Sequence, residues 1–285
     1  MHRMGAAYLE QVAPGIRRLL APNPSPFTFT GTQTYVVGCG EVAVIDPGPD
    51  DPAHVTALLA ALGQERVAAI LVTHTHRDHS PASRSLAAST GAPILGCAPL
   101  ALPDDGPRAD AEFDFDYRPD RVLADGERES RPGWTLQAVA TPGHTSNHLC
   151  FALAEEGALF TGDHVMGWST TIVSPPDGDM ADYMRSLELL RARDDRIYYP
   201  THGPAIVQPR QHVQALIDHR RMREAQILER LEAGEDTIAA MVSALYTDTD
   251  PALHPAAQRS VLAHLIDLEQ RARVAFDGEK WKLAA

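Results

Sequence analysis

The 285-residue sequence predicts an α+β protein, in which β-sheets carry helices on their outer faces and a small winged-helix-like unit follows. Two observations support this fold class. In the first two thirds of the chain, short β-branched runs that end in Gly- or Asp-containing turns alternate with helical patterns. After about residue 209, three helical patterns and one Asp-Gly hairpin replace the strands. We therefore expect two domains, residues 1–209 and residues 210–285.

The first domain is expected to begin with three strands, one helix and a fourth strand. In order, these elements cover residues 15–20, 28–38, 42–45, 51–62 and 67–72. A helix at 80–90 and a strand at 92–96 follow, and residues 101–131 are expected to form a surface loop with short strands. The later strands are expected at 134–140, 149–153, 158–161 and 197–200, with a helix at 182–192. The second domain is expected to have helices at 212–233, 236–245 and 255–272 and a hairpin at 274–283.

Composition restricts the class of partner. The chain has 25 Lys+Arg and 38 Asp+Glu, so its formal charge is −13, and a broad acidic surface repels nucleic acids and anionic membranes. Its three widely spaced cysteines form no C-x-x-C motif, which fits buried thiols in a reducing compartment. No secretory signal and no 18-residue apolar run is present. We therefore expect a cytoplasmic protein that does not bind membranes.

The most informative stretch is His74-Thr-His76-Arg-Asp78-His79, which directly follows the apolar strand 67–72. Imidazole and carboxylate side chains on a loop can turn toward one point, and they suit zinc and also manganese or iron(II). The alternative is a solvated polar loop, which the density of four ligand-type groups in six residues disfavours.

Three further ligand-type residues, His144, Asp163 and His202, each follow an expected strand. Loops at the same edge of a sheet can converge, so seven groups with one bridging carboxylate can serve two metal ions, most simply two Zn²⁺ per chain. We expect the first metal to bind His74, His76 and His144. The second is expected to bind Asp78, His79 and His202, and Asp163 is expected to bridge the two.

Such a pair of metals would lower the pKa of a bridging water and present it as hydroxide to an acyl carbonyl or a phosphorus. Asp78 is the candidate to orient this hydroxide. His164, adjacent to Asp163, is the candidate acid for the leaving group, with a surface or core position as the alternative. Asp46 is either an acceptor for a ligand imidazole or a turn residue before Pro-Gly, and His148 is a candidate supporting residue.

Taken in order, these motifs resemble the metal-binding motifs of the metallo-β-lactamase superfamily of hydrolases. The matching stretches are T-H-T-H-R-D-H at 73–79, P-G-H-T at 142–145, T-G-D at 161–163 and T-H-G at 201–203. The resemblance implies a four-layer αβ/βα sandwich over residues 15–205, with the site at the edge between two sheets.

Residues 162–171, the helix at 182–190 and H-R-x-M-R-E at 219–224 further resemble the β-lactamase-like protein 2 group. That group includes an animal endoribonuclease and, more distantly, fungal polyketide thioesterases. Two departures exclude neighbouring groups. His76 stands where flavodiiron proteins carry Glu, which favours zinc over a redox di-iron site. True zinc β-lactamases lack a His at the position of His79, which argues against β-lactam hydrolysis.

Three functions follow as hypotheses. The preferred one is hydrolysis of a small ester, thioester or lactone, because the acidic charge disfavours a long polyanion. The alternative is a metal-dependent single-strand endoribonuclease. The third is a binding module whose winged helix contacts nucleic acid, although acidic Asp267 and Glu269 accompany its arginines. We expect this unit to pack on the hydrolase domain, covering the pocket mouth, or on a second subunit in a homodimer.

Overall fold

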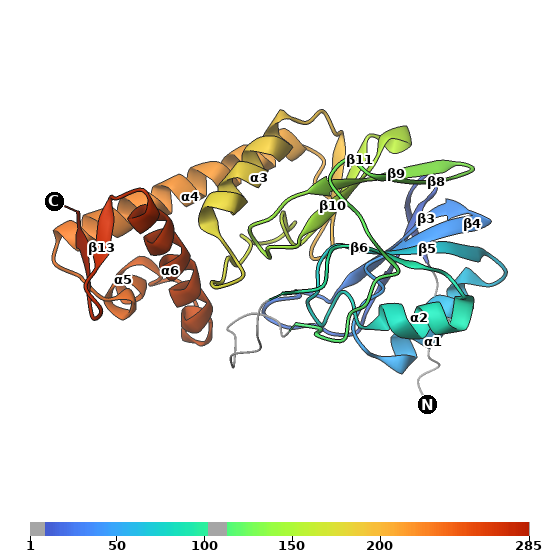
Figure 1. Cartoon of the computed structure of the whole chain (residues 1–285), viewed down its shortest axis with the longest axis horizontal. Coiled ribbons are helices and arrows are strands. Elements are labelled where there is room, and N and C mark those ends of the chain that lie inside the picture. Colours follow the sequence, from blue (N-terminus) through green and yellow to red (C-terminus); the bar gives the residue numbers. More distant parts are fainter. Residues whose placement is uncertain (1–8, 102–112, 285) are drawn as a thin grey trace.

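The computed structural model describes residues 9–101 and 113–284, so part of the expected 101–131 surface loop lies outside the described residues. Two β-sheets pack face to face, with helices on both outer faces, and a helical unit extends from one end (Figure 1). This arrangement confirms the predicted fold class. None of the described helices is both long and apolar enough to cross a bilayer.

The first sheet has seven strands in the order β1-β2-β3-β4-β5-β6-β7. Neighbours from β1 to β4 are antiparallel, and neighbours from β4 to β7 are parallel. The strands are β1 Glu10–Ala13, β2 Ile16–Leu20, β3 Gln33–Cys39, β4 Glu41–Ile45, β5 Arg66–Val72, β6 Ile94–Gly96 and β7 Arg121–Val122.

The second sheet has five strands in the order β12-β11-β10-β9-β8, and only β11 and β12 run parallel. The strands are β8 Arg128–Arg131, β9 Trp134–Ala140, β10 Leu149–Leu153, β11 Ala158–Gly162 and β12 Ile197–Pro200. Strand β10 is buried on both faces, and its side chains alternate between two cores. Phe151 and Leu153 face the first sheet, whereas Cys150 and Ala152 face the helices.

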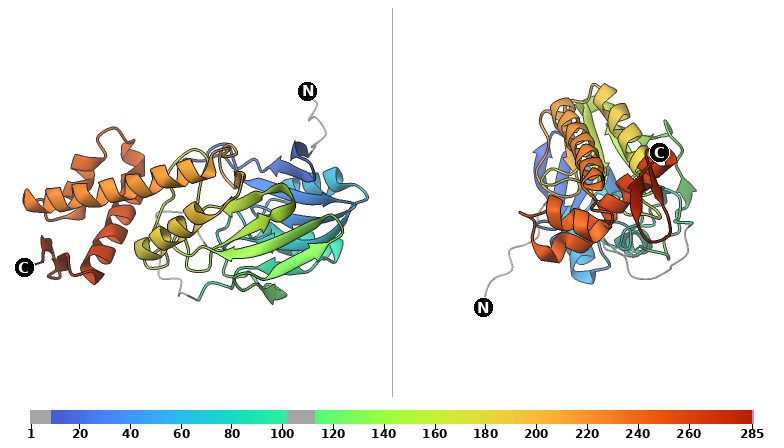
Figure 2. Two further views of the ribbon diagram at one scale, coloured as in Figure 1. Left: turned by 90° about the horizontal axis from the view of Figure 1, so that it is seen from above. Right: turned by 90° about the vertical axis from the view of Figure 1, so that its left-hand side faces the viewer.

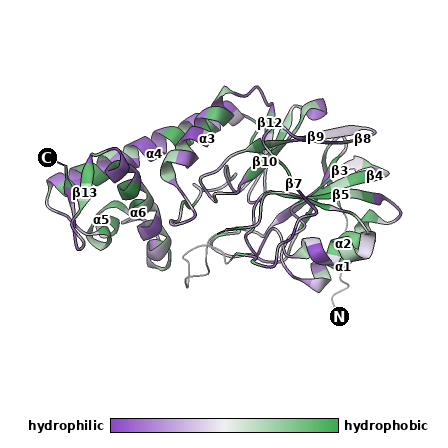
Figure 3. Ribbon diagram, in the orientation of Figure 1, coloured by the Kyte–Doolittle hydropathy of each residue, from purple (hydrophilic) through white to green (hydrophobic). Residues whose placement is uncertain are grey.

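Helices complete the outer layers. Helices α1 (Pro52–Leu62) and α2 (Ala82–Thr90) contribute Leu58 and Leu86 to the core with the first sheet. Helix α3 (Met180–Ala192) and the first half of α4 (Pro209–Glu232) cover the second sheet. The strands of the two inner layers are largely hydrophobic, whereas the outer helices α3 and α4 also carry hydrophilic residues (Figure 3).

The C-terminal unit has its own core. It contains α5 (Ile238–Leu245), α6 (His254–Gln270) and the hairpin β13 (Val274–Phe276) and β14 (Trp281–Leu283). Two 3₁₀ turns, Ala154–Glu156 and Pro251–Leu253, complete the described helical elements. The long helix α4 links the two-sheet part of the chain to the C-terminal unit (Figure 2). Its residue Val213 packs in the core with the second sheet, and its residue Ile227 packs in the C-terminal core. The division at residue 209/210 stays a prediction.

Two local expectations are wrong. The strand expected from residue 28 begins only at Gln33, because Phe29 (φ 58°) and Gly31 (φ 132°) have positive φ angles that interrupt an extended strand. The thiols of Cys97 and Cys150 are buried as expected, but Cys39, at the end of β3, is exposed.

Candidate metal centre

The ligand-type residues lie where strands of both sheets end. The parallel strands β4 and β5 end side by side, which places the loop after Ile45 next to the loop after Val72. In the second sheet, the parallel strands β11 and β12 end at Gly162, one residue before Asp163, and at Pro200, two residues before His202. His144 follows β9 in the turn before β10. The structure therefore brings all seven predicted residues to one edge of the sandwich.

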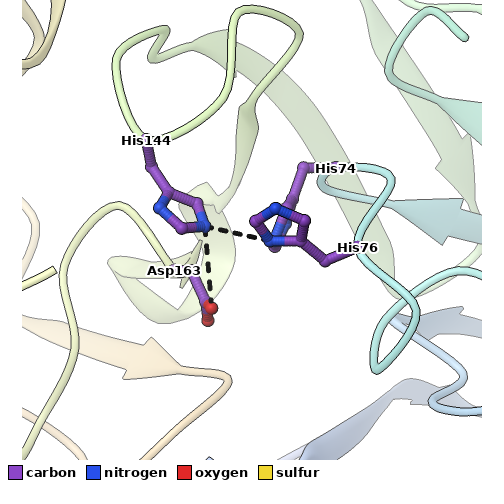
Figure 4. Close-up of side chains that lie close together, drawn as sticks. All are labelled: His74, His76, His144 and Asp163. Atoms are coloured by element: carbon purple, nitrogen blue, oxygen red, sulfur yellow. Dashed lines mark hydrogen bonds and ion pairs between the residues drawn. The ribbon is translucent and has the colours of Figure 1, made fainter. Parts of the chain in front are cut away.

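The first cluster contains His74, His76, His144 and Asp163 (Figure 4). His76 Nδ1 lies 2.9 Å from His74 Nε2 and 3.2 Å from His144 Nε2. The Asp163 carboxylate lies 3.8 Å from His144 Nε2. Three buried imidazoles thus direct nitrogen atoms toward one small volume, with a carboxylate beside it.

The second cluster contains Asp78, His79 and His202. The Asp78 carboxylate lies 3.3 Å from His79 Nε2 and 3.1 Å from His202 Nε2. One oxygen of Asp163 lies 3.4 Å from His79 Nε2, and its other oxygen lies 3.4 Å from His202 Nε2. The Asp163 carboxylate therefore stands between the two clusters, which is the position expected of a bridging ligand.

Hydrogen bonds on the far side of the rings orient these histidines. His144 Nδ1 donates to the carbonyl of Ile172 at 2.7 Å, and His202 Nδ1 donates to the carbonyl of Gly31 at 3.2 Å. A carbonyl oxygen only accepts, so in the neutral rings the Nε2 lone pair is free to face the site. This tautomer is the one that binds a metal through Nε2.

Asp46 supports the site from the end of β4. Its buried carboxylate lies 3.0 Å from His79 Nδ1 and accepts hydrogen bonds from the backbone N–H of Thr73 and the hydroxyls of Thr73 and Thr201. The contact with His79 confirms the acceptor interpretation of Asp46. Because Asp46 touches loops from both sheets, it ties His79 to the edge where the clusters meet.

His148 and Gly162 set the position of Asp163. His148 Nε2 accepts a hydrogen bond from the Asp163 backbone N–H at 3.2 Å, and its Nδ1 lies 2.8 Å from the Thr141 hydroxyl. Gly162 has a φ of 50°, and a Cβ atom there would lie 2.6 Å from His148 Nε2 and 2.9 Å from Thr73 Oγ1. Glycine is therefore required for the close approach that presents Asp163 to both clusters.

Burial and neighbouring charges determine the protonation of the two clusters. Burial lowers the pKa of His74 and His76 well below its usual value, and neighbouring imidazoles lower it further. Burial opposes ionisation of Asp78 and Asp163, but His79 and His202 hold the pKa of both carboxyls well below its usual range. Against the effect of burial, the same carboxylates raise the pKa of His202 to about 10. His74 and His76 are therefore neutral imidazoles, whereas the second cluster is an ion-paired network in which a metal would replace protons.

The donor set fits divalent metal ions. Five imidazoles and two carboxylates, in two groups whose ligand atoms lie within 4.8 Å of one another, match the ligands that zinc, manganese and iron(II) share. A His/Asp cluster of this kind indicates divalent metal binding.

The predicted proton donor, His164, lies beside the candidate metal centre but outside its cavity. Its fully buried ring lies 4.7 Å from the Tyr183 ring, centroid to centroid, and neither ring nitrogen has a hydrogen-bond partner among the described residues. It does not line the cavity at the metal centre. Burial, followed by the nearby His144 and Arg220, lowers its pKa to about 3. His164 therefore packs behind the site, and its role as a proton donor stays a prediction.

The cavity at the clusters is small, about 40 Å³, and includes Phe27 and Thr28 from the loop before β3. A second cavity of about 370 Å³ shares Phe27, Met166 and Ile172 with it. Residues of α4, α5–α6 and the loop after β11 form the walls of this second cavity. The C-terminal unit thus borders the approach to the metal centre, as expected. The sequence carries no motif that would have placed Phe27 or Thr28 at the site.

Comparison with known proteins decides the family. The model of the metallo-beta-lactamase superfamily matches residues 27–202, and that of the beta-lactamase associated winged helix domain matches residues 237–281. The chain belongs to the metallo-beta-lactamase superfamily. It is accordingly a metal-dependent hydrolase, and the resemblance inferred from its motifs is confirmed.

Three relatives illustrate the match. An atrochrysone carboxyl ACP thioesterase of Aspergillus fumigatus is 36% identical over 79% of this chain and 67% of its own length. A beta-lactamase-like protein 2 homolog of Drosophila melanogaster is 33% identical over 90% of this chain and 88% of its own length. The crystal structure of a metallo-beta-lactamase family protein from Thermus thermophilus superimposes with a TM-score of 0.78 at 26% identity, covering 96% of this chain and all of that one.

Proposed function

We propose that this superfamily member is a dinuclear metal hydrolase that cleaves small acyl thioesters. The position of the Asp163 carboxylate between two histidine clusters supports the proposal, because a carboxylate there could bridge two ions. His74, His76 and His144 would hold one ion. Asp78, His79 and His202 would hold the other. Zinc is the proposed metal, since His76 supplies a neutral nitrogen ligand in the first cluster.

Two bound divalent ions would lower the pKa of a water toward neutrality and polarise a substrate carbonyl. The protein's own residues do the rest. Asp78 accepts a hydrogen bond from the Thr32 hydroxyl at 3.2 Å and lines the small cavity, so its carboxylate is held where it can orient the attacking water. Phe27, Met166 and Ile172 form apolar walls that exclude bulk water from the same cavity.

The lining of this cavity favours a thioester. Among the described residues that line it, every ionisable side chain is a candidate metal ligand, so no separate acid is available to protonate a leaving group. A thiol has a pKa of about 8.5 and leaves as a thiolate without such help, whereas an alkoxide needs a proton. The similarity to a protein named as an ACP thioesterase points in the same direction.

The test is metal-dependent hydrolysis of a panel of small thioesters, oxygen esters and lactones, compared with cleavage of single-stranded RNA at 50 and 200 mM salt. We expect thioesters to have the highest kcat/KM, with little salt dependence, because one carbonyl and one metal pair form the contact. A protein that neutralises six to ten phosphates would lose roughly 10³–10⁵ in affinity over that range. RNA cleavage with such a salt slope, lost in His74→Ala, would replace this proposal with the endoribonuclease alternative.

A further inference from the structure

The 370 Å³ cavity beside the metal centre has an unusual charge for this protein. The chain has 38 Asp+Glu and 25 Lys+Arg, yet no carboxylate lines the cavity among the described residues, whereas Arg220 and Arg223 do. His219 lines it as well. Burial, followed by the charges of Arg220 and Arg223, lowers the pKa of His219 to about 4. The cavity therefore carries a positive charge inside an acidic protein.

Arg220 is a buried cation in the wall of this cavity. Its residue is only 3% exposed, and it forms no ion pair with a carboxylate in residues 9–101 or 113–284. Its guanidinium donates to the carbonyl of Thr171 and lies over the Tyr183 ring, 5.1 Å from the centroid. Its Nε atom has no hydrogen-bond partner within the described chain. Buried charges are normally paired, so this guanidinium has donor capacity and charge that an anionic ligand can match.

Arg223, one turn further along α4, repeats the pattern. It donates to the carbonyl of Leu245 at 3.0 Å and stacks on Tyr246, 4.2 Å from the ring centroid, and it too has no carboxylate partner among the described residues. Its Nε atom is also without a hydrogen bond in the described chain. By contrast, the exposed Arg221 on the same helix pairs with Glu188 at 3.0 Å. Among the arginines of α4, the two that line the cavity are therefore the ones without a carboxylate partner in the described chain.

We propose that Arg220 and Arg223 form a subsite for an oxyanion on the acyl part of the substrate, a carboxylate or a phosphate remote from the bond that is cleaved. The inference rests on the proposed thioester hydrolysis. The two cavities share Phe27, Met166 and Ile172, so one substrate can place its carbonyl at the metals and its anionic end at the arginines. Guanidinium groups match both oxyanions through paired N–H donors.

The subsite is tested with three thioesters of one small thiol: 4-carboxyphenylacetyl, 4-carbamoylphenylacetyl and 4-phosphonophenylacetyl. The first two have nearly the same shape and differ in charge. A charge-assisted contact predicts a kcat/KM for one of the anionic compounds at least about tenfold above that of the neutral amide. The better of the two anions identifies the oxyanion. Equal kcat/KM values for all three would overturn the subsite.

Variants separate recognition from a structural role of the arginines. In Arg223→Gln the preference for the anion should fall about tenfold, and Arg223→Lys should retain part of it because the charge remains. Arg221→Gln, on the exposed face of the same helix, is the matched control and should keep the wild-type preference. If Arg223 only supports α5, Arg223→Gln will lower the thermal midpoint and both kcat/KM values together, which contradicts the proposal. If a variant fails to fold, the ratio of the wild-type kcat/KM values for the anionic and neutral thioesters still tests the subsite.

A binding measurement separates this inference from the proposed function. The probes are the matching ketones, in which a methylene replaces the thioester sulfur, and calorimetry reports their affinity without turnover. Tighter binding of the anionic ketone by the wild-type protein, without hydrolysis of any thioester, would support the subsite and contradict the thioesterase function. Hydrolysis of the thioesters with equal affinity for all ketones would support the thioesterase function and contradict the subsite.

Discussion

At the scale of single residues, the direction of each side chain decides whether it can reach the metal centre. Asp163 and His164 are adjacent, yet Asp163 faces the clusters and His164 packs against Tyr183. The turn at Gly162, with φ of 50°, decides which side chain faces inward, and no spacing rule reveals that angle. The role of His148 in holding the Asp163 backbone depends on the same turn.

Asp46→Asn should lower metal affinity by about 10–100-fold, as expected for loss of a residue that orients a ligand. The amide would turn N–H groups toward the Thr73 and Thr201 hydroxyls and His79 Nδ1, all of which now contact one carboxylate oxygen. Competition with a chelator measures the change, with the exposed Asp50→Asn as control. Wild-type affinity in Asp46→Asn would show that His79 is oriented by other contacts.

His264→Leu should make stability less sensitive to acid. Burial, followed by the charges of Arg220 and Arg223, lowers the pKa of His264 well below its usual value, so the folded state binds fewer protons than the unfolded one. As pH falls below about 6.5, this difference removes up to ~1.4 kcal/mol of unfolding free energy per pH unit. Denaturant unfolding at pH 7 and pH 5 should show a smaller loss in the variant. An equal loss in both proteins would mean that His264 is protonated when folded.

At the scale of elements, the helices and most strands follow from hydrophobic period, because buried faces impose it. The strand expected at residues 28–38 begins only at Gln33, because residues 25–31 form a turn. Phe27 and Thr28 of this turn line the cavity at the metal centre. Helix α4 was expected as a long helix. Its division between two cores was not predictable, because one helical pattern does not identify the surfaces that cover it.

Truncation after Pro209 should cause aggregation or a changed oligomeric state. The cut removes Val213 and Ile217 of α4, which cover the outer face of the second sheet together with α3. Burial of each large aliphatic side chain contributes ~1.5–3 kcal/mol to the free energy of unfolding. Loss of these two side chains therefore exposes an apolar face that favours association. Size-exclusion chromatography checks this, with a chain ending at residue 233 as the control that keeps α4. A monomeric, fully active 1–209 fragment would show that α4 is dispensable.

At the scale of the whole molecule, the strand and helix patterns predicted sheets with outer helices, and the ligand-type residues at strand ends predicted the seven candidate ligands. The αβ/βα sandwich was implied by the resemblance of these motifs to the metallo-β-lactamase superfamily. The sequence did not predict the cavity between the two parts of the chain. Arg220 and Arg223 are separated in sequence from Phe27 and Thr171 by long stretches, and only tertiary packing makes them neighbours. Net charge, an average over the surface, concealed this local cationic site.

The central claim is that seven residues from four loops hold two divalent ions, with Asp163 between them. Its most direct test is elemental analysis of metal per chain after purification without chelator, in the wild-type protein and in Asp163→Asn. We predict two ions per chain in the wild type. In Asp163→Asn we predict at most one ion and almost no hydrolysis, with an unchanged circular dichroism spectrum. One ion or none in the wild type, or two ions and full activity in Asp163→Asn, would contradict the account.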